Sequence, residues 1–355
     1  MLIKIIKYLK NIFVSWKSYF IIKNLNQNKK KITFYAETIA DWSFLEPIAQ
    51  CLNQKKINFI KITSDSNDEN LKDDNVYFIG YGMPRTILFR TIKTSGFIMT
   101  LTDLDSFHLK KSIYPVHYFY FFHSLASTHR TYRENAFNAY DTIFCTGKYQ
   151  INEIRETEKK YNLNKKKLIE QGYVRLDELL KRRKEYNNKK TRIIIAPTWG
   201  ESSLIEKHLY NLINILISEN YFVTLRLHPM TLRNRPKIAN EIIKKFLKTG
   251  KFIYDSDLRN EKTIINNDIM ISDWSGAALE FAFANERPVI FIDMKPKINN
   301  KNWKIINQPC FEDYIRKNIG KVVSENDIKK IPNIINELLK HSKDLSKDIS
   351  KIRDK

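Results

Sequence analysis

The sequence predicts an α/β protein with two doubly wound parallel-sheet domains. Short apolar runs alternate with segments of helical periodicity from about residue 31 to residue 292, and repeated β-then-α spacing is typical of parallel sheets with right-handed crossovers. A polar, charged stretch at residues 181–190 separates two sets of such runs and is the predicted linker. A chain of 355 residues with 43% hydrophobic residues also has enough length and apolar content for two cores.

The N-terminal segment differs from the rest of the chain in its charge. Residues 1–31 contain eight lysines and no acidic residue, and apolar residues recur at helical spacing between them. This pattern predicts a basic amphipathic helix over residues 1–30 that lies on an anionic membrane surface. Two alternatives remain: a first helix packed on the domain, and a secretory signal, against which the interrupting lysines and the lack of a small-residue cleavage site argue.

The first predicted domain, residues 31–185, contains six runs that we expect to be buried strands. They are Ile32–Ala36, Asn58–Thr63, Val76–Gly80, Gly96–Leu101, Val116–Phe122 and Thr142–Thr146. Helical periodicity between them is clearest over Ser43–Leu52 and Gln150–Tyr161.

The second predicted domain, residues 186–330, repeats this alternation and is followed by a charged helical tail at residues 331–355. Its predicted strands are Arg192–Ala196, Phe222–Arg226, Phe252–Tyr254, Asp268–Ser272 and Pro288–Ile292. Its predicted helices include Leu204–Ile217, Ile238–Leu247 and Ser275–Ala284.

The composition limits the class of protein. A formal net charge of +22 favours anionic partners such as nucleic acid, phosphate-bearing substrates or an anionic bilayer, unless the lysines only form a solvated surface. Three widely spaced cysteines exclude a disulfide framework and a zinc ribbon. No apolar run approaches the roughly 18–20 residues of a membrane-spanning helix. We therefore expect a soluble or peripheral protein of a reducing compartment.

Candidate chemistry lies at predicted strand ends, where open α/β sheets bind ligands. The sequence contains no G-x-G-x-x-G, P-loop, G-x-S-x-G or H-E-x-x-H motif. One predicted strand ends at Ser272-Asp273, and a helix opens at Ser275-Gly276. The first amides of that helix and its dipole would attract an anion, although an ordinary Ser-capped helix has the same pattern.

A second strand end carries Arg226 and His228, just before Pro229. Residues two apart share one face of a strand, and this pair suits the binding of a diphosphate. A structural histidine near the end of a strand is the alternative for His228.

A third strand end carries His123, which follows an aromatic strand. A polar turn with Ser124, His129 and Arg130 comes directly after it. His123 is the imidazole best placed to act as a base, and a hydrogen-bonded structural histidine is the alternative.

Two other patterns suggest a metal or a nucleic acid. Asp103-Leu-Asp105 has the D-x-D spacing of metal-dependent sugar-nucleotide transferases, but such a triplet is common by chance in a charged loop. The lysine-rich stretches 165–167 and 181–190 lack the interleaved aromatics of a single-strand binding platform. We expect no metal, no cofactor and no nucleic-acid partner.

The order of these segments resembles that of a known family. Over about Phe122 to Pro296, the chain resembles the CDP-glycerol glycerophosphotransferase family of teichoic-acid-type polymer synthesis. His123-Ser124 is similar to the W-H-G motif of that family. Ile195-Ala-Pro-Thr-Trp199 is similar to its A-P-T-[WF] strand end, and Leu225-Arg-Leu-His-Pro229 to its K-x-H-P motif.

Two longer stretches extend the resemblance. Phe144-Cys-Thr-Gly-Lys-Tyr149 with Gln171-Gly-Tyr-Val-Arg-Leu-Asp177 is similar to the family's S-x-x…G-x-P-R-x-D stretch. Ser272-Asp-Trp-Ser-Gly276 through Arg287-Pro288 is similar to S-D-Y-S-S…F-D-F…L-x-[KR]-P. The chain departs from the family at Phe122, Ser124, Val174 and Gly276, where the family has Trp, Gly, Pro and Ser, and it has Leu279-Glu280-Phe281 in place of F-D-F.

The resemblance implies a GT-B fold, in which the two domains face a cleft. It implies transfer of glycerol phosphate, or a related polyol phosphate, from a CDP-linked donor to a hydroxyl of a cell-surface glycan or lipid-linked acceptor, with release of CMP. His123 would be the general base, and His228 and the helix start at Ser275 would bind the donor pyrophosphate. The other implied donor-side residues are Arg226, Ser272, Asp273, Gly276 and Thr198, and the implied acceptor or cleft residues are Ser124, His129, Arg130, Arg175 and Asp177.

The same resemblance suggests a place in the cell. A cationic interfacial helix would hold a peripheral enzyme on the cytoplasmic face of the bacterial membrane, next to lipid-linked acceptors. Three alternatives remain: a GT-B glycosyltransferase that uses a nucleotide sugar, a metal-dependent version that uses Asp103 and Asp105, and a non-catalytic basic protein. The last would bind nucleic acid or membrane in a salt-dependent way without turnover.

Overall fold

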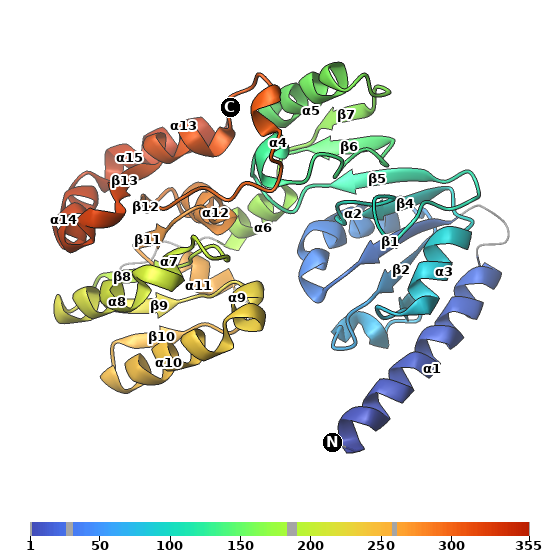
Figure 1. The fold of residues 1–355 in the computed structure, drawn as a ribbon, viewed down its shortest axis with the longest axis horizontal. Coiled ribbons are helices and arrows are strands. Elements are labelled where there is room, and N and C mark those ends of the chain that lie inside the picture. Colours follow the sequence, from blue (N-terminus) through green and yellow to red (C-terminus); the bar gives the residue numbers. More distant parts are fainter. Residues whose placement is uncertain (1, 26–30, 183–189, 258–260, 355) are drawn as a thin grey trace. The chain divides into compact units, whose positions relative to one another are not determined.

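The structure is a computed structural model that describes residues 2–25, 31–182, 190–257 and 261–354 (Figure 1). The chain divides into two compact units. Unit 1 comprises Met1–Ser124, Tyr132–Arg175 and Asn299–Gln308, and unit 2 comprises Leu125–Thr131, Leu176–Ile298 and Pro309–Lys355. The predicted boundary at residues 185 and 186, and most of the predicted linker, lie outside the described residues.

Unit 1 is built on a seven-stranded sheet in the order β3-β2-β1-β4-β5-β6-β7, and each neighbouring pair is parallel. The six predicted strands are confirmed to within two residues at each end, and β7 was not predicted. The strands are β1 (Ile32–Ala36), β2 (Phe59–Thr63), β3 (Val76–Phe78), β4 (Gly96–Met99), β5 (His117–Phe121), β6 (Thr142–Cys145) and β7 (Lys167–Glu170).

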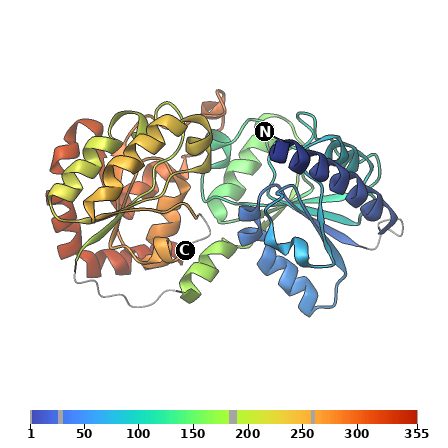
Figure 2. The same cartoon turned by 90° about the horizontal axis from the view of Figure 1, so that it is seen from below.

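Helices cover both faces of this sheet, as the view in Figure 2 also shows. Tyr35 of β1 packs in one core cluster with residues of α1 and α3, whereas its neighbour Phe34 packs in another with residues of α2. Strands buried on both faces read as continuous apolar runs, which is why they could be predicted. The helices that begin in this unit are α1 (Leu2–Leu25), α2 (Trp42–Gln54), α3 (Met83–Thr91), α5 (Lys148–Lys160) and α6 (Val174–Arg182).

Unit 2 contains a six-stranded parallel sheet in the order β10-β9-β8-β11-β12-β13. The five predicted strands are confirmed to within one residue at each end, and the edge strand β13 was not predicted. The strands are β8 (Arg192–Ile195), β9 (Phe222–Leu225), β10 (Phe252–Tyr254), β11 (Ile269–Ser272), β12 (Val289–Asp293) and β13 (Gly320–Ser324).

The helices of unit 2 pack on this sheet around one large apolar cluster. The predicted helix Leu204–Ile217 is divided in two at His208, and the predicted tail forms the last two helices. The helices are α4 (Thr128–Thr131), α7 (Leu204–Lys207), α8 (Leu209–Ser218), α9 (Pro229–Asn234), α10 (Pro236–Phe246), α11 (Glu261–Ile265), α12 (Gly276–Asn285), α13 (Phe311–Asn318), α14 (Ile331–Lys340) and α15 (Ser342–Arg353).

Both sheets are doubly wound, because the strand order reverses once in each. The reversal falls between β1 and β4 in unit 1 and between β8 and β11 in unit 2. Ligands of open α/β sheets bind at the carboxyl ends of the strands at this point. The topology therefore directs attention to the loops that follow these four strands.

The two halves of α1 differ in burial. Its second half packs against α3 and β3, and it buries Tyr19 and Ile22. Its first half leaves a stripe of large apolar side chains in solvent, among them Leu9 and Phe13, which are 58% and 72% exposed. No helix in the described part of the chain is long and apolar enough to cross a membrane.

Candidate functional site

The carboxylate of Asp273 organises the loops at the strand reversal of unit 2. Asp273 follows β11 and is completely buried. Its Oδ1 accepts hydrogen bonds from the amides of Thr198 (2.7 Å) and Trp274 (2.8 Å), and its Oδ2 accepts one from the amide of Leu204 (3.0 Å). Burial raises the pKa of Asp273, and these amide bonds oppose that rise. One side chain thus ties the end of β11 to the loop after β8 and to the start of α7.

Ser272 has a similar structural role. Its hydroxyl is completely buried and donates to the carbonyl oxygen of Ala196 at 2.7 Å. The bond joins the carboxyl ends of β11 and β8, which flank the strand reversal. Ser272, Asp273 and Thr198 therefore shape the crevice through contacts with one another's loops.

The start of α12 lies directly after this loop. Ser275 is its N-cap residue in an extended conformation, and the Ser275 side chain makes no capping hydrogen bond. Residues 275–277 are only half-buried. The first amides of a helix have no partner within the helix and carry its positive dipole end. Ser275 and Gly276 thus stand where an anion can bind.

His228 follows β9, the strand next to β8, and is the N-cap residue of α9. Its Nδ1 accepts a hydrogen bond from the amide of Met230 at 3.1 Å. This bond assigns the proton of the neutral imidazole to Nε2, because one ring nitrogen accepts while the other donates. His228 can therefore donate a hydrogen bond from Nε2 to a phosphate oxygen.

Arg226 is held by a partner that the sequence pattern did not reveal. It is 6% exposed, and its Nη1 lies 3.2 Å from Oδ2 of Asp255, which follows β10. Burial raises the pKa of Asp255 and the charge of Arg226 lowers it. The positive charge of Arg226 is thus balanced within the protein.

Trp199, in the loop after β8, contacts two nitrogen-bearing side chains. Its ring centroid is 5.9 Å from that of His228, and the Lys297 ammonium lies 3.1 Å from its centroid. A cavity of about 230 Å³ adjoins this ring, and Met230, Glu201 and Arg235 contribute to its lining. Trp199 lies within a motif of the family resemblance, whereas no sequence pattern indicated Lys297.

The candidate base His123 belongs to unit 1, two residues after the end of β5. Its Nδ1 lies 3.5 Å from the hydroxyl of Tyr120, and its carbonyl oxygen accepts a hydrogen bond from Tyr173 at 3.2 Å. The rings of Phe44 and Tyr132 meet the imidazole edge-on, at 6.3 and 6.1 Å between centroids. The ring is thus fixed by aromatic neighbours while it stays partly exposed.

The remaining residues predicted near the acceptor are spread over both units. Ser124 accepts a hydrogen bond on its carbonyl oxygen from Gln150 at 3.5 Å, within unit 1. Arg175 is buried in unit 1 with its guanidinium 5.8 Å from the ring centroid of Phe44. Asp177 is exposed in the first turn of α6 and belongs to unit 2.

His129 and Arg130 lie in the short segment of the chain that belongs to unit 2. Both are buried. Arg130 forms hydrogen bonds from Nη1 to both carboxylate oxygens of Asp313 at 2.8 and 2.9 Å, and Nε2 of His129 lies 3.3 Å from the sulfur of Cys310. These side chains therefore hold α4 on α13.

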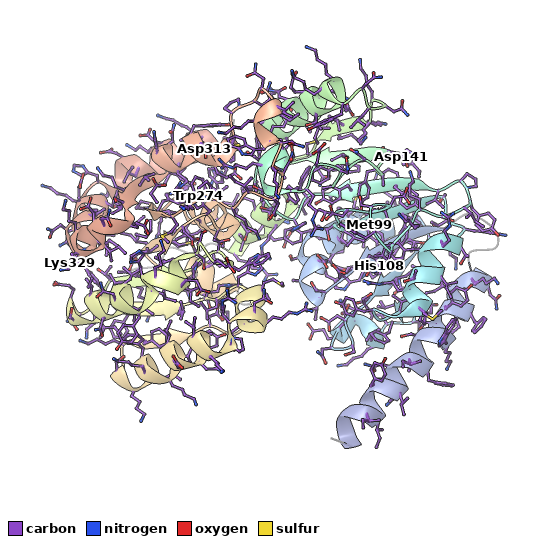
Figure 3. All side chains as sticks on the ribbon, viewed as in Figure 1. Met99, His108, Asp141, Trp274, Asp313 and Lys329 are labelled. Atoms are coloured by element: carbon purple, nitrogen blue, oxygen red, sulfur yellow. The ribbon has the colours of Figure 1, made fainter. Side chains whose placement is uncertain are left out.

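A tryptophan between two arginines is the main feature that the sequence did not reveal. The guanidinium carbons of Arg130 and Arg316 lie 5.0 and 3.8 Å from the ring of Trp274, and Trp274 and Asp313 are labelled in Figure 3. The Trp274 indole donates to the carbonyl oxygen of Met294 at 2.6 Å. This stack fixes the residue that immediately precedes Ser275.

The D-x-D triplet is engaged in local contacts. Asp103 lies 3.1 Å from Nη1 of Arg133, and Asp105 accepts a hydrogen bond from the amide of Lys111 at 3.1 Å. Within the ranges that the structure describes, no three His, Cys, Asp or Glu residues form a group that could hold a metal ion.

Comparison with solved structures identifies the fold as GT-B-like. A structure of the wall teichoic acid polymerase TagF matches with a TM-score of 0.54 and 15% identity over 99% of this chain and 96% of that one. A TagF histidine variant soaked with CDPG matches with a TM-score of 0.54 and 16% identity over 99% and 95%. UDP-GlcNAc 2-epimerase from Neisseria meningitidis, bound to UDP-GlcNAc, matches with a TM-score of 0.60 and 12% identity over 91% and 98%.

The family is shown by the sequence itself. The family model described as CDP-glycerol:poly(glycerophosphate) glycerophosphotransferase matches residues 123–348, which is more than half of the chain. The chain belongs to this family and is a transferase. No curated protein matches the sequence.

Replacement of Asp273 by Asn tests whether this carboxylate holds the surrounding loops in place. Asn offers one acceptor oxygen and an NH₂ donor to three amide donors, so at least one buried amide loses its partner. We expect the free energy of unfolding to fall by about 1–3 kcal/mol, measured by urea denaturation. Asp348→Asn, on the exposed face of α15, should change it little, and equal stability of both variants would contradict the assignment.

Proposed function

We propose that the protein transfers glycerol phosphate, or a related polyol phosphate, from a CDP-linked donor to a hydroxyl of a lipid-linked or glycan acceptor and releases CMP. The observation that carries the proposal is the family match over residues 123–348. The arrangement at the strand reversal of unit 2 supports it, because a helix start after β11 and a histidine donor after β9, at the same edge of the parallel sheet, suit a diphosphate.

We assign donor binding to unit 2. The amides at Ser275 and Gly276 and the Nε2 proton of His228 would bind the pyrophosphate. Ser272, Asp273 and Thr198 would hold the loops that present these groups. Arg226, whose charge Asp255 balances, would fix the strand end from which His228 projects.

We assign the general base to His123 in unit 1. The imidazole would take the proton of the acceptor hydroxyl as its oxygen attacks the glycerol-bearing phosphorus. The bond from that phosphorus to the bridging oxygen breaks, and CMP leaves with that oxygen. Groups that hold the phosphates and balance their charge supply most of the catalysis in such a transfer.

The structures of TagF give these two assignments further support. They include histidine variants at two positions of that protein, and nearly the same number of residues separates those positions as separates His123 from His228. One of these variants was soaked with CDPG.

CMP release from CDP-glycerol, with bacterial membranes as the acceptor, tests the reaction. We expect His123→Ala to lower the rate about 100-fold or more, as for loss of a general base, and His228→Ala about 100-fold or more, as for loss of a charge-stabilising donor. His341→Ala, at an exposed position between α14 and α15, is the matched control and should keep full activity.

Three outcomes would change these assignments. If the His123→Ala variant keeps its turnover, the assignment of His123 as general base is wrong. If CMP is released only from CDP-ribitol, the transferred group is ribitol phosphate and not glycerol phosphate. If the enzyme turns over a nucleotide sugar and no CDP-polyol, a glycosyltransferase is favoured.

We also propose that α1 attaches the enzyme to the cytoplasmic leaflet. The exposed apolar stripe of α1 includes Ile5, Leu9, Ile12 and Phe13, and it lies in the first half of the helix, before the buried residues Tyr19 and Ile22. The exposed Lys10 and Lys17 flank the stripe. Each lysine near an anionic surface would contribute about 1 kcal/mol of attraction, and the apolar stripe would insert at the boundary of the headgroups.

Flotation with lipid vesicles tests this attachment. The wild type should float with vesicles that contain phosphatidylglycerol and less with pure phosphatidylcholine. The double change Leu9→Glu and Phe13→Glu should abolish flotation, because it places carboxylates on the inserted face. Tyr210→Glu, an exposed aromatic of α8, is the control. Equal flotation of wild type and double variant would refute the attachment through α1.

A further inference from the structure

We propose that the ammonium of Lys297 binds a phosphate group of the nucleotide-linked donor. This inference rests on the proposed function and adds a cation that neither the motifs nor the family resemblance had indicated. Lys297 lies in the segment after β12, and its ammonium is 3.1 Å from the centroid of the Trp199 ring. The segment thus returns from the end of β12 to the loop after β8, at the strand reversal of unit 2.

Lys297 and His228 contact the same indole. The imidazole of His228 lies 5.9 Å from the Trp199 ring, centroid to centroid. Both nitrogen-bearing groups therefore lie at one side chain of the loop after β8. The loop that carries Trp199 is in turn fixed by Asp273, which also begins the turn into α12. One small region of unit 2 thus holds an ammonium, an imidazole and a helix start.

No described residue balances the charge of Lys297. Among the described residues no carboxylate forms an ion pair with its ammonium. The nearby acids are engaged or remote: Asp273 is buried under three amide bonds, Glu206 pairs with Arg235, and Glu201 is exposed at the rim of the adjoining cavity. The other groups on neighbouring loops are His228 and the exposed Lys295, neither of which supplies negative charge.

The partial burial of Lys297 has a measurable consequence. Burial alone lowers the pKa of Lys297 to about 8, because no neighbouring charge compensates for lost hydration. A bound phosphate would favour the charged form and raise that pKa. The affinity for the donor would therefore be highest below pH 8. It would fall as the pH rises above 8, by up to about tenfold per pH unit. Binding near pH 8 would also take up a proton.

This behaviour distinguishes a phosphate ligand from a packing residue. A lysine that only covers Trp199 would affect stability and leave the pH dependence of donor binding unchanged. The diphosphate of a doubly esterified donor does not titrate between pH 7 and 10, so it would not mimic the effect. An arginine stays charged throughout this range and would keep the phosphate contact.

Isothermal titration calorimetry with CDP-glycerol from pH 6.5 to 9.5 tests the inference on the full chain. We expect wild-type affinity to fall above pH 8, with proton uptake seen as a difference between buffers of unlike ionisation enthalpy. Lys297→Met should weaken binding about tenfold or more below pH 8 and remove the pH dependence. Lys297→Arg should bind with an affinity that changes little up to pH 9.5. Lys295→Met, an exposed lysine of the same segment, should resemble the wild type.

Each result has one meaning. If the wild type binds CDP-glycerol and Lys297→Met binds it equally at every pH, the Lys297 assignment is wrong and the proposed function stands. If Lys297→Met does not fold, Lys297→Arg decides: an affinity that still falls above pH 8 overturns the assignment. A wild type that binds no CDP-glycerol overturns the proposed function and the Lys297 assignment together.

Discussion

The geometry of unit 2 depends on one buried carboxylate. Asp273 accepts three backbone hydrogen bonds, one from the next residue and two from the segment that runs from the end of β8 to the start of α7, at the point where the sheet reverses its strand order. Backbone amides in tight loops have no ladder partner, and a buried amide without a partner is costly. The carboxylate satisfies them and fixes Trp199 and the start of α12 through the loops that carry them. The candidate donor site follows from this constraint.

Charge placement around that site explains which residues can act on a diphosphate. Arg226 is balanced by Asp255, and Arg130 is balanced by Asp313, so both serve the packing of unit 2. Lys297 has no such partner among the residues that the structure describes, and His228 has its tautomer set by a backbone amide. An anion-binding site needs positive groups that the protein itself has not neutralised. Sequence motifs alone do not separate these two kinds of basic residue.

The sequence predicted the fold well because most strands are buried on both faces. The edge strands β7 and β13 were missed, since Lys167 and Lys321 face solvent and make these runs look like charged loops. The ends of strands with Ser275, His228 and His123 could be predicted from local pattern. The pairing of Arg226 with Asp255 could not, because it depends on strand order, and the contact of Lys297 with Trp199 depends on where a long loop returns.

The central claim is that the acceptor oxygen attacks phosphorus and that CMP is the leaving group. Phosphorus NMR of the purified enzyme with CDP-glycerol and membrane acceptor observes that bond directly. The account predicts that the diphosphate resonances decay while two products appear in equal amounts: CMP, which is a phosphate monoester, and a new phosphodiester. Release of CDP, with its diphosphate intact and no new phosphodiester, would show that the carbon–oxygen bond breaks instead and would contradict the account.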